Sequence, residues 1–298
     1  MRIVTRGDLD GLTCSVLIGL NEKRDDVLLV HPQDLTEDRV EIRDTDIIAN
    51  LPYHPNCQMW FDHHMHTAAT FTPPSGFRGR FGRAPSAARL VYDYYGATVS
   101  MPQYELLVRE TDRLDSATLT LDDILNPQGY IKVGFTLDSR SGLGSFEPYF
   151  LTLFRLLLDK WPIQKILTHT EVARRCQALD ANNANLHEAL KAHSTVRDNL
   201  VVTDFRQVER VPVGNRFLIF ATYPGINVAA RIQWGPNREF MVVTLGHSIM
   251  NRTCRTNVGE LAARYGGGGH QGAASIKLTG DDADEKLELI FEELIENG

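Results

Sequence analysis

The stretch RIVTRGDLDGLTCSVLIGL, residues 2–20, decides the fold class. Its first four residues favour a short strand, and apolar residues then recur at helical spacing, at Leu12, Val16, Leu17 and Leu20. Further short apolar runs of strand length follow between helical or polar segments: Val27–Val30, Asp46–Leu51 and Met59–Phe61. Such strands are typical of a parallel sheet covered on both faces, and they predict an α/β domain.

Length and charge limit the class of protein. A chain of 298 residues suggests two domains at about 150 residues each. The formal charge of −7 argues against a protein that coats long duplex nucleic acid, but it allows a small anionic substrate held by local cations or a metal. No apolar run approaches the roughly 20 residues of a membrane span, and the first residues lack an apolar leader. We therefore expect a cytoplasmic protein with no membrane partner.

The domain boundary is expected near a long helical stretch, residues 163–193, whose second half is mostly polar. A helix that is polar all round usually connects two bodies. We predict a first domain over residues 1–185, a helical linker over 186–200 and a second domain over 201–298. The strands expected after the linker are Asn199–Asp204, Phe217–Tyr223, Asn227–Gln233, Phe240–Leu245 and Ile276–Leu278. The apolar run Phe150–Leu158 fits either a core or the interface of a homodimer.

Two motifs directly follow predicted strands. Asp8 and Asp10 come after the first strand, where open α/β sheets bind ligands, and their hard oxygen atoms suit Mg²⁺ or Mn²⁺. A helix cap is the alternative role for these carboxylates. Asp62, His63 and His64 follow the strand Met59–Phe61. An acid and two imidazoles there can supply a metal ligand, a group that orients the ligand and a general acid.

A glycine run, Gly266-Gly267-Gly268-Gly269-His270, lies between a predicted helix and a predicted strand. Consecutive glycines expose backbone N–H groups that can surround an anion, so we predict phosphate binding by Gly267, Gly268, Gly269 and His270. The alternative is a flexible linker. Arg83 and Ser86 flank another predicted helix start, which favours anion binding and simple helix capping equally.

Together, Asp8-x-Asp10-Gly11, Asp62-His63-His64 and the late Gly-Gly-Gly-Gly-His270 resemble the DHH phosphoesterase superfamily, in order and spacing, over nearly the whole chain. The C-terminal half resembles its DHHA1 substrate domain. The resemblance implies a parallel-sheet DHH domain holding one or two Mn²⁺ (or Mg²⁺) ions, joined by a helical linker to a smaller α/β DHHA1 domain. The superfamily includes RecJ-type exonucleases, oligoribonucleases, cyclic-dinucleotide phosphodiesterases and exopolyphosphatase-related proteins. Arg252 and Arg255 resemble the family's phosphate-binding arginine.

Two positions depart from the family pattern, which usually has His at Arg6 and a bridging Asp at Asn50. Both departures affect mainly the ligands of the same one of the two ions. The ligands of the other ion survive as Asp10, His63 and Asp112, with Asp115 as the competing choice for the last of these. We therefore expect at most one catalytic ion, with the permanent charge of Arg6 in place of the other cation. His31, Asp34, Asp44 and Asp46 are the alternative ligands for a rebuilt second site.

The expected function is metal-dependent hydrolysis of a phosphoester or phosphoanhydride in a nucleotide, short oligonucleotide or phosphate chain, bound in the cleft between the domains. In this interpretation Asp8 orients or shares the water on the ion, Asp62 and His64 support the ligands, and Arg6 and His270 stabilise phosphate charge. The alternative is a degenerate member that binds a nucleotide or phosphate ligand without efficient hydrolysis, because Arg6 and Asn50 replace metal ligands.

Overall fold

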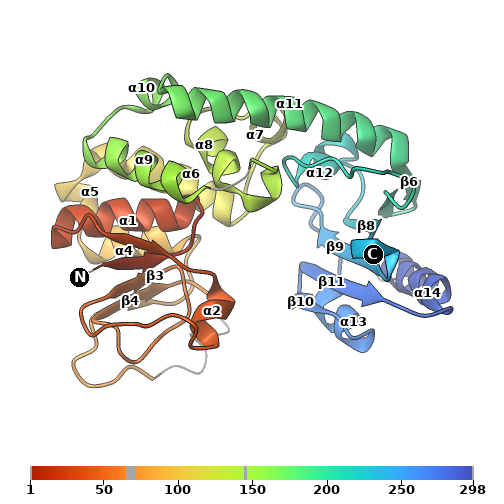
Figure 1. Cartoon of the computed structure of the whole chain (residues 1–298), viewed down its shortest axis with the longest axis horizontal. Coiled ribbons are helices and arrows are strands. Elements are labelled where there is room, and N and C mark those ends of the chain that lie inside the picture. Colours follow the sequence, from red (N-terminus) through yellow and green to blue (C-terminus); the bar gives the residue numbers. More distant parts are fainter. Residues whose placement is uncertain (1, 65–71, 144–145, 297–298) are drawn as a thin grey trace. The chain divides into compact units, whose positions relative to one another are not determined.

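The computed structural model describes residues 2–64, 72–143 and 146–296 (Figure 1). The chain forms two compact units: Met1–Leu119 with Pro127–Leu179, and Thr120–Asn126 with Asp180–Gly298. Helix α11, Thr170–His193, runs through the division between them. Among the described residues, no helix has both the length and the apolar character needed to cross a membrane.

The first unit is built on a fully parallel five-stranded sheet, which confirms the predicted fold class. Its strand order is β2-β1-β3-β4-β5. The strands are β1 Ile3–Thr5, β2 Val27–Leu29, β3 Ile47–Ala49, β4 Met59–Asp62 and β5 Gly79–Phe81. Because the chain runs from β1 to β2 on one side and returns to β3 on the other, the strand order reverses beside β1. Open α/β sheets bind ligands at the carboxyl ends of the strands next to such a reversal.

In each short strand, successive side chains point to opposite faces of the sheet, and both faces are buried. On one face Ile3, Ile47 and Phe61 pack with the helices of the main core. On the other face Val4 and Trp60 join a smaller cluster under α2 and the neighbouring loops. Both faces are therefore covered, as the apolar runs predict. The helices of this unit are α1 Leu9–Glu22, α2 Pro32–Thr36, α4 Ala87–Tyr94, α5 Ala97–Ser100, α6 Glu105–Asp115, α8 Gly129–Leu137, α9 Glu147–Leu158 and α10 Ile163–Leu167.

The apolar run Phe150–Leu158 lies within α9. Phe150, Leu153 and Phe154 are buried in the main core of the first unit. The core therefore accounts for the apolar character of the run, and a homodimer stays a prediction.

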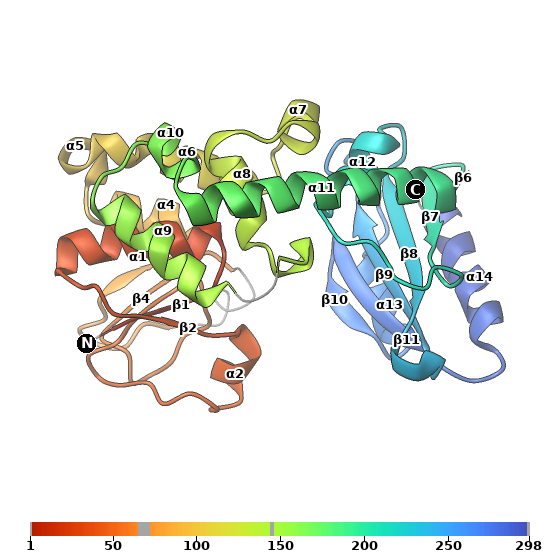
Figure 2. The ribbon, with the colours of Figure 1, turned by 45° about the horizontal axis from the view of Figure 1, so that its top comes forward.

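The second unit contains a six-stranded mixed sheet with the order β10-β11-β9-β8-β7-β6 (Figure 2). Only β7 and β8 pair in parallel. Helices α13 and α14 bury apolar side chains against this sheet. The elements are α7 Leu121–Leu125, β6 Ser194–Arg197, β7 Leu200–Asp204, α12 Leu218–Thr222, β8 Val228–Trp234, β9 Met241–His247, α13 Val258–Arg264, β10 Gly268–His270, β11 Ala273–Leu278 and α14 Ala283–Glu296.

Some local predictions were wrong. The expected strand Phe217–Tyr223 is the helix α12, because its apolar run is too short for periodicity to separate strand from helix. The Asn215 carboxamide accepts a hydrogen bond from the Phe217 amide just before this helix. The last part of the expected helical linker forms β6 and the turn before β7. The last two glycines of the glycine run, Gly268 and Gly269, lie in the edge strand β10.

The core of the first unit allows a matched test of burial. Val108 on α6 is fully buried, whereas Val99 on α5 is 89% exposed. Val108→Ala should lower the free energy of unfolding by about 2 kcal/mol, because it removes buried methyl groups and leaves a cavity. Val99→Ala should change it by less than about 0.5 kcal/mol. Urea denaturation of both variants measures the difference, and equal effects would contradict the packing described here.

Candidate functional site

The carboxyl ends of β1, β3 and β4 bring the predicted motifs to one edge of the first sheet. Asp8 is the N-cap of α1, which follows β1, and Asp10 lies in the first turn of that helix. Asn50 follows β3, and His63 follows β4. Since β1, β3 and β4 are neighbours, residues far apart in the sequence meet where the strand order reverses.

Asp10 is a buried carboxylate held by the start of α4. Its Oδ2 accepts a hydrogen bond from the Ala87 amide at 2.9 Å, and its Oδ1 accepts one from the Ala88 amide at 2.7 Å. Burial raises the pKa of Asp10 well above its ordinary value, and the charge of Asp115 adds to this, whereas His63 acts against it. The sequence left anion binding and helix capping equally open at the start of α4, and the structure shows a carboxylate of the protein itself bound there.

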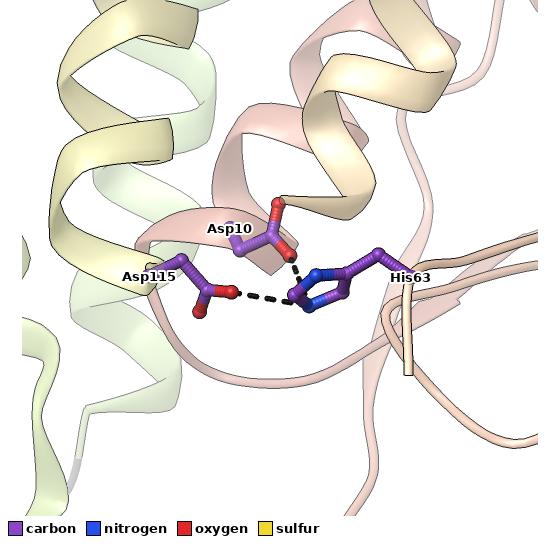
Figure 3. A group of neighbouring side chains, drawn as sticks. All are labelled: Asp10, His63 and Asp115. Carbon is purple, nitrogen blue, oxygen red and sulfur yellow. Dashed lines mark ion pairs between the residues drawn. The ribbon is translucent and has the colours of Figure 1, made fainter. Parts of the chain in front are cut away.

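His63 lies between two carboxylates (Figure 3). Its Nδ1 donates to the Ala84 carbonyl oxygen at 3.1 Å, which turns Nε2 toward the acids. Nε2 lies 3.1 Å from Asp115 Oδ2 and 3.8 Å from Asp10 Oδ2. Burial lowers the pKa of His63, but Asp115 and Asp10 outweigh this effect and raise the pKa to about 9.

This group of side chains fits a divalent cation. Asp10, His63 and Asp115 each offer a ligand atom, and all of these atoms lie within 4.8 Å of one another. Among the described residues, the buried Nε2 of His63 finds no partner in hydrogen-bonding geometry. A backbone carbonyl that fixes the other ring nitrogen is the usual support of a histidine ligand. One imidazole with two carboxylates suits Mn²⁺ or Mg²⁺ in donor type.

The sequence favoured Asp112 as the last metal ligand, but in the structure its carboxylate binds other residues. Its carboxylate accepts hydrogen bonds from Ser86 Oγ at 2.6 Å and from the Arg89 guanidinium at 2.9 and 2.7 Å. Ser86 also caps α4 by accepting from the Arg89 amide. The structure thus brings Asp115, the competing choice, to His63. Asp112 instead ties α6 to the start of α4.

Asp8 does not join the metal-binding group in this structure. Its Oδ1 accepts hydrogen bonds from the Gly11 amide at 2.9 Å and from Asn50 Nδ2 at 3.0 Å. The Arg6 Nε lies 3.3 Å from Asp8 Oδ2. Asn50 is buried and has a φ of 56°, a left-handed conformation that asparagine tolerates better than most residues. Each carboxylate oxygen of Asp8 therefore already faces a group of the protein: the Asn50 amide at Oδ1 and the Arg6 guanidinium at Oδ2.

Other predicted residues hold further contacts at this edge. His64 Nδ1 lies 2.6 Å from Oδ1 of the buried Asp62. The alternative ligands for a second ion are largely engaged elsewhere: Asp46 pairs with Arg2, and Asp34 pairs with Arg39. His31 accepts from the Gln33 amide and caps α2. Sequence reasoning missed the Ala84 carbonyl and the Ala87 and Ala88 amides, because backbone groups leave no signal in residue type.

The predicted phosphate-binding residues of the glycine run and its neighbours belong to the second unit. Arg252, Arg255 and His270 are exposed, and Arg252 Nε donates to the Ile249 carbonyl oxygen. Gly267 lies so close to β11 that a Cβ there would be 2.3 Å from the Ser275 carbonyl oxygen. Close strand packing thus explains Gly267, whereas phosphate binding by Gly267, Gly268 and Gly269 stays a prediction.

Solved structures resemble the whole chain. It is 35% identical to the pGpG-specific phosphodiesterase PggH from Vibrio cholerae, with a TM-score of 0.89, covering 100% of this chain and 99% of that chain. A DHH domain from a member of the s1p family of ribosomal proteins matches at 14% identity and a TM-score of 0.57, covering 99% and 87%. RecJ from Thermus thermophilus in complex with Mn²⁺ matches at 15% identity and a TM-score of 0.52, covering 99% and 52%.

No family model and no curated protein sequence matches the chain. The full-length relative nevertheless establishes the class of protein, and the two more distant structures share its fold. The chain belongs to the DHH phosphoesterase superfamily, which confirms the resemblance seen in its motifs.

The choice between Asp115 and Asp112 can be tested by metal binding. Asp115→Asn should weaken Mn²⁺ binding by about tenfold or more, because it removes an anionic ligand oxygen. Asp112→Asn should leave the affinity nearly unchanged but lower the free energy of unfolding by about 1–3 kcal/mol, because it weakens the contacts to Arg89 and Ser86. Calorimetric titration with Mn²⁺ and urea denaturation measure both effects. A loss of Mn²⁺ affinity confined to Asp112→Asn would contradict the assignment.

A second pair of variants separates packing from phosphate binding in the glycine run. Gly267→Ala should destabilise the second unit by about 1–3 kcal/mol, because its Cβ would overlap the β11 backbone. Gly268→Ala is the control, since a Cβ at Gly268 meets no atom within 4 Å. Thermal unfolding without substrate measures both variants. If they were equally stable, the packing argument for Gly267 would be wrong.

Proposed function

We propose that this chain is a divalent-metal-dependent phosphodiesterase that acts on small nucleotides, with the linear dinucleotide pGpG as the first substrate to test. The observation that carries the proposal is the Asp10–His63–Asp115 group at the carboxyl edge of the sheet. The similarity to PggH over the full chain supports the class of substrate. The net charge of −7 also favours a small ligand over long nucleic acid.

Asp10, His63 and Asp115 would hold one Mn²⁺ or Mg²⁺ ion. When bound, such an ion supplies positive charge to a phosphoryl oxygen and activates water. The distant RecJ structures contain Mn²⁺ or Mg²⁺, which supports the choice of these ions. A single ion is proposed because the Asp8 carboxylate is already engaged by Arg6 and Asn50.

Arg6 takes the role of a built-in cation in this proposal. Its side chain is 45% exposed although its Nε lies beside Asp8, so part of the guanidinium remains accessible to a ligand. A planar guanidinium can fork onto two phosphate oxygens, but it cannot activate water as a metal does. Asp8 thus positions Arg6, and this revises the metal-ligand role expected for Asp8.

His64 is the proposed general acid. Its Nδ1–H would donate to the buried Asp62, which orients the ring. A water molecule would lose a proton to solvent and add to phosphorus. As the bond to the leaving alcohol oxygen breaks, His64 would give its Nε2 proton to that oxygen, and solvent would return a proton to His64. The His64 side chain is 34% exposed, so substrate can reach it. Arg252, Arg255, Gly267, Gly268, Gly269 and His270 remain the proposed substrate-binding residues of the second unit.

Hydrolysis of pGpG by metal-stripped and Mn²⁺-loaded protein tests this function. GMP release should require Mn²⁺, and His63→Ala should lower kcat/KM by about 100-fold or more, because it removes a ligand. His54→Ala is the matched control: His54 also faces a carboxylate, that of Asp38, and the two histidine side chains are 16% and 13% exposed. Chromatography of the products gives the rates.

The same assay distinguishes the proposed hydrolase from the alternative, a protein that binds the nucleotide without hydrolysing it efficiently. The network of Arg6, Asp8 and Asn50 favours a degenerate member, because it engages the carboxylate at which a second ion could bind. Tight binding of pGpG without GMP release would support that binding protein. The absence of both binding and release would contradict pGpG as the ligand.

A further inference from the structure

The segment that leaves β5 and enters the first turn of α4, residues 82–88, supports the proposed metal group with its polar atoms. The Ala84 carbonyl fixes the ring of His63, and the Ala87 and Ala88 amides hold Asp10. Ser86 joins the segment to Asp112 on α6. The segment is therefore anchored beside the site through its backbone and one hydroxyl.

Arg83 is the charged side chain of this segment, and it takes no part in these contacts. It is exposed, and within residues 2–64, 72–143 and 146–296 its guanidinium forms no ion pair or hydrogen bond. Two other arginines of the same unit are paired instead: Arg89 with Asp112, and Arg78 with Glu22. Arg83 thus keeps its full charge and all its donors for a ligand.

Arg83 lies one residue before Ala84, whose carbonyl oxygen holds the Nδ1 of His63. The two Cα atoms are about 3.8 Å apart, so the charge of Arg83 enters the site from the segment that supports this histidine. Among the described residues, no atom lies within 4 Å of a Cβ built on the preceding Gly82, so this side of the turn is open. A ligand on the metal group that reaches Arg83 would extend over this side of the turn.

The charges of the site indicate which part of a ligand Arg83 would meet. Asp8, Asp10 and Asp115 make this edge acidic. In the proposed function, one divalent ion and Arg6 would offset the charge of the phosphate that is cleaved. A second phosphate on the same ligand needs a cation of its own. A terminal phosphate carries more charge than a linking one and offers the oxygens that a guanidinium forks onto.

We propose that Arg83 binds the 5′-terminal phosphate of a linear dinucleotide whose linking phosphate lies at the Asp10–His63–Asp115 group. Arg83 would then select 5′-phosphorylated dinucleotides over unphosphorylated ones. The inference rests on the proposed phosphodiesterase function and names the feature of the substrate that is recognised.

Steady-state kinetics with pGpG and with GpG, which lacks the 5′ phosphate, test the role of Arg83. Arg83→Ala should raise KM for pGpG about tenfold, as expected for a lost charge-assisted hydrogen bond, with kcat and all GpG constants nearly unchanged. Arg83→Lys should recover part of the loss, because it restores the charge without the fork.

Arg80→Ala is the matched control. Arg80 is also exposed and forms no ion pair or hydrogen bond within the described part of the chain, but it lies on β5 instead of beyond its carboxyl end. Its loss changes the net charge equally and should alter neither KM. Equal losses on pGpG and GpG in Arg83→Ala would overturn the proposal, as would an unchanged KM for pGpG.

A binding measurement tests the role of Arg83 whether or not the protein hydrolyses these dinucleotides. Analogues of pGpG and GpG whose linking 3′ oxygen is replaced by CH₂ resist hydrolysis, and calorimetry gives their affinities for the wild type and the variants. A preference for the 5′-phosphorylated analogue that disappears in Arg83→Ala supports the proposal even if the wild type hydrolyses neither substrate. Wild-type affinities that are equal for both analogues would overturn it.

Discussion

The carboxylate of Asp10 at the N-terminus of α4 is the contact on which the rest of the site depends. It sits beside the chain reversal at β1, and it joins α1 to α4 through the Ala87 and Ala88 amides. A buried carboxylate is costly unless it is hydrogen-bonded, and the positive end of a helix offsets part of that cost. Asp112, Ser86 and Arg89 then fix α4 against α6, which carries Asp115. The geometry of the proposed metal group therefore follows from packing between helices as much as from its ligands.

The second feature of the site is the engagement of the Asp8 carboxylate by other groups of the protein. In the proposed family pattern of paired ions, a carboxylate in this position would face a cation. Here the Arg6 guanidinium and the Asn50 amide occupy its two oxygens. A fixed guanidinium keeps its charge at every physiological pH and needs no metal supply, but it cannot activate water, so this role would fall to the one proposed ion. We therefore propose a phosphodiesterase with one ion and one built-in cation.

The sequence allowed the class of fold and the main motifs to be predicted, because both depend on local patterns. Short apolar strands followed by Asp8, Asp10 and His63 give the parallel sheet and its polar edge. The choice between Asp112 and Asp115 could not be made in this way. The two residues lie three positions apart on α6, and the contact of Asp112 with Arg89 decides which one is available. Likewise, Phe217–Tyr223 forms a helix although its composition suits a strand equally well.

Anomalous diffraction at the manganese edge, from crystals equilibrated with excess Mn²⁺, would reveal how many ions the site binds and which residues hold them. We expect one anomalous peak per chain, with Asp10, His63 and Asp115 as its protein ligands and the contacts of Arg6 and Asn50 to Asp8 intact. A second peak coordinated by Asp8 would contradict the single-ion site, and a lone peak at Asp112 would contradict the choice of ligands.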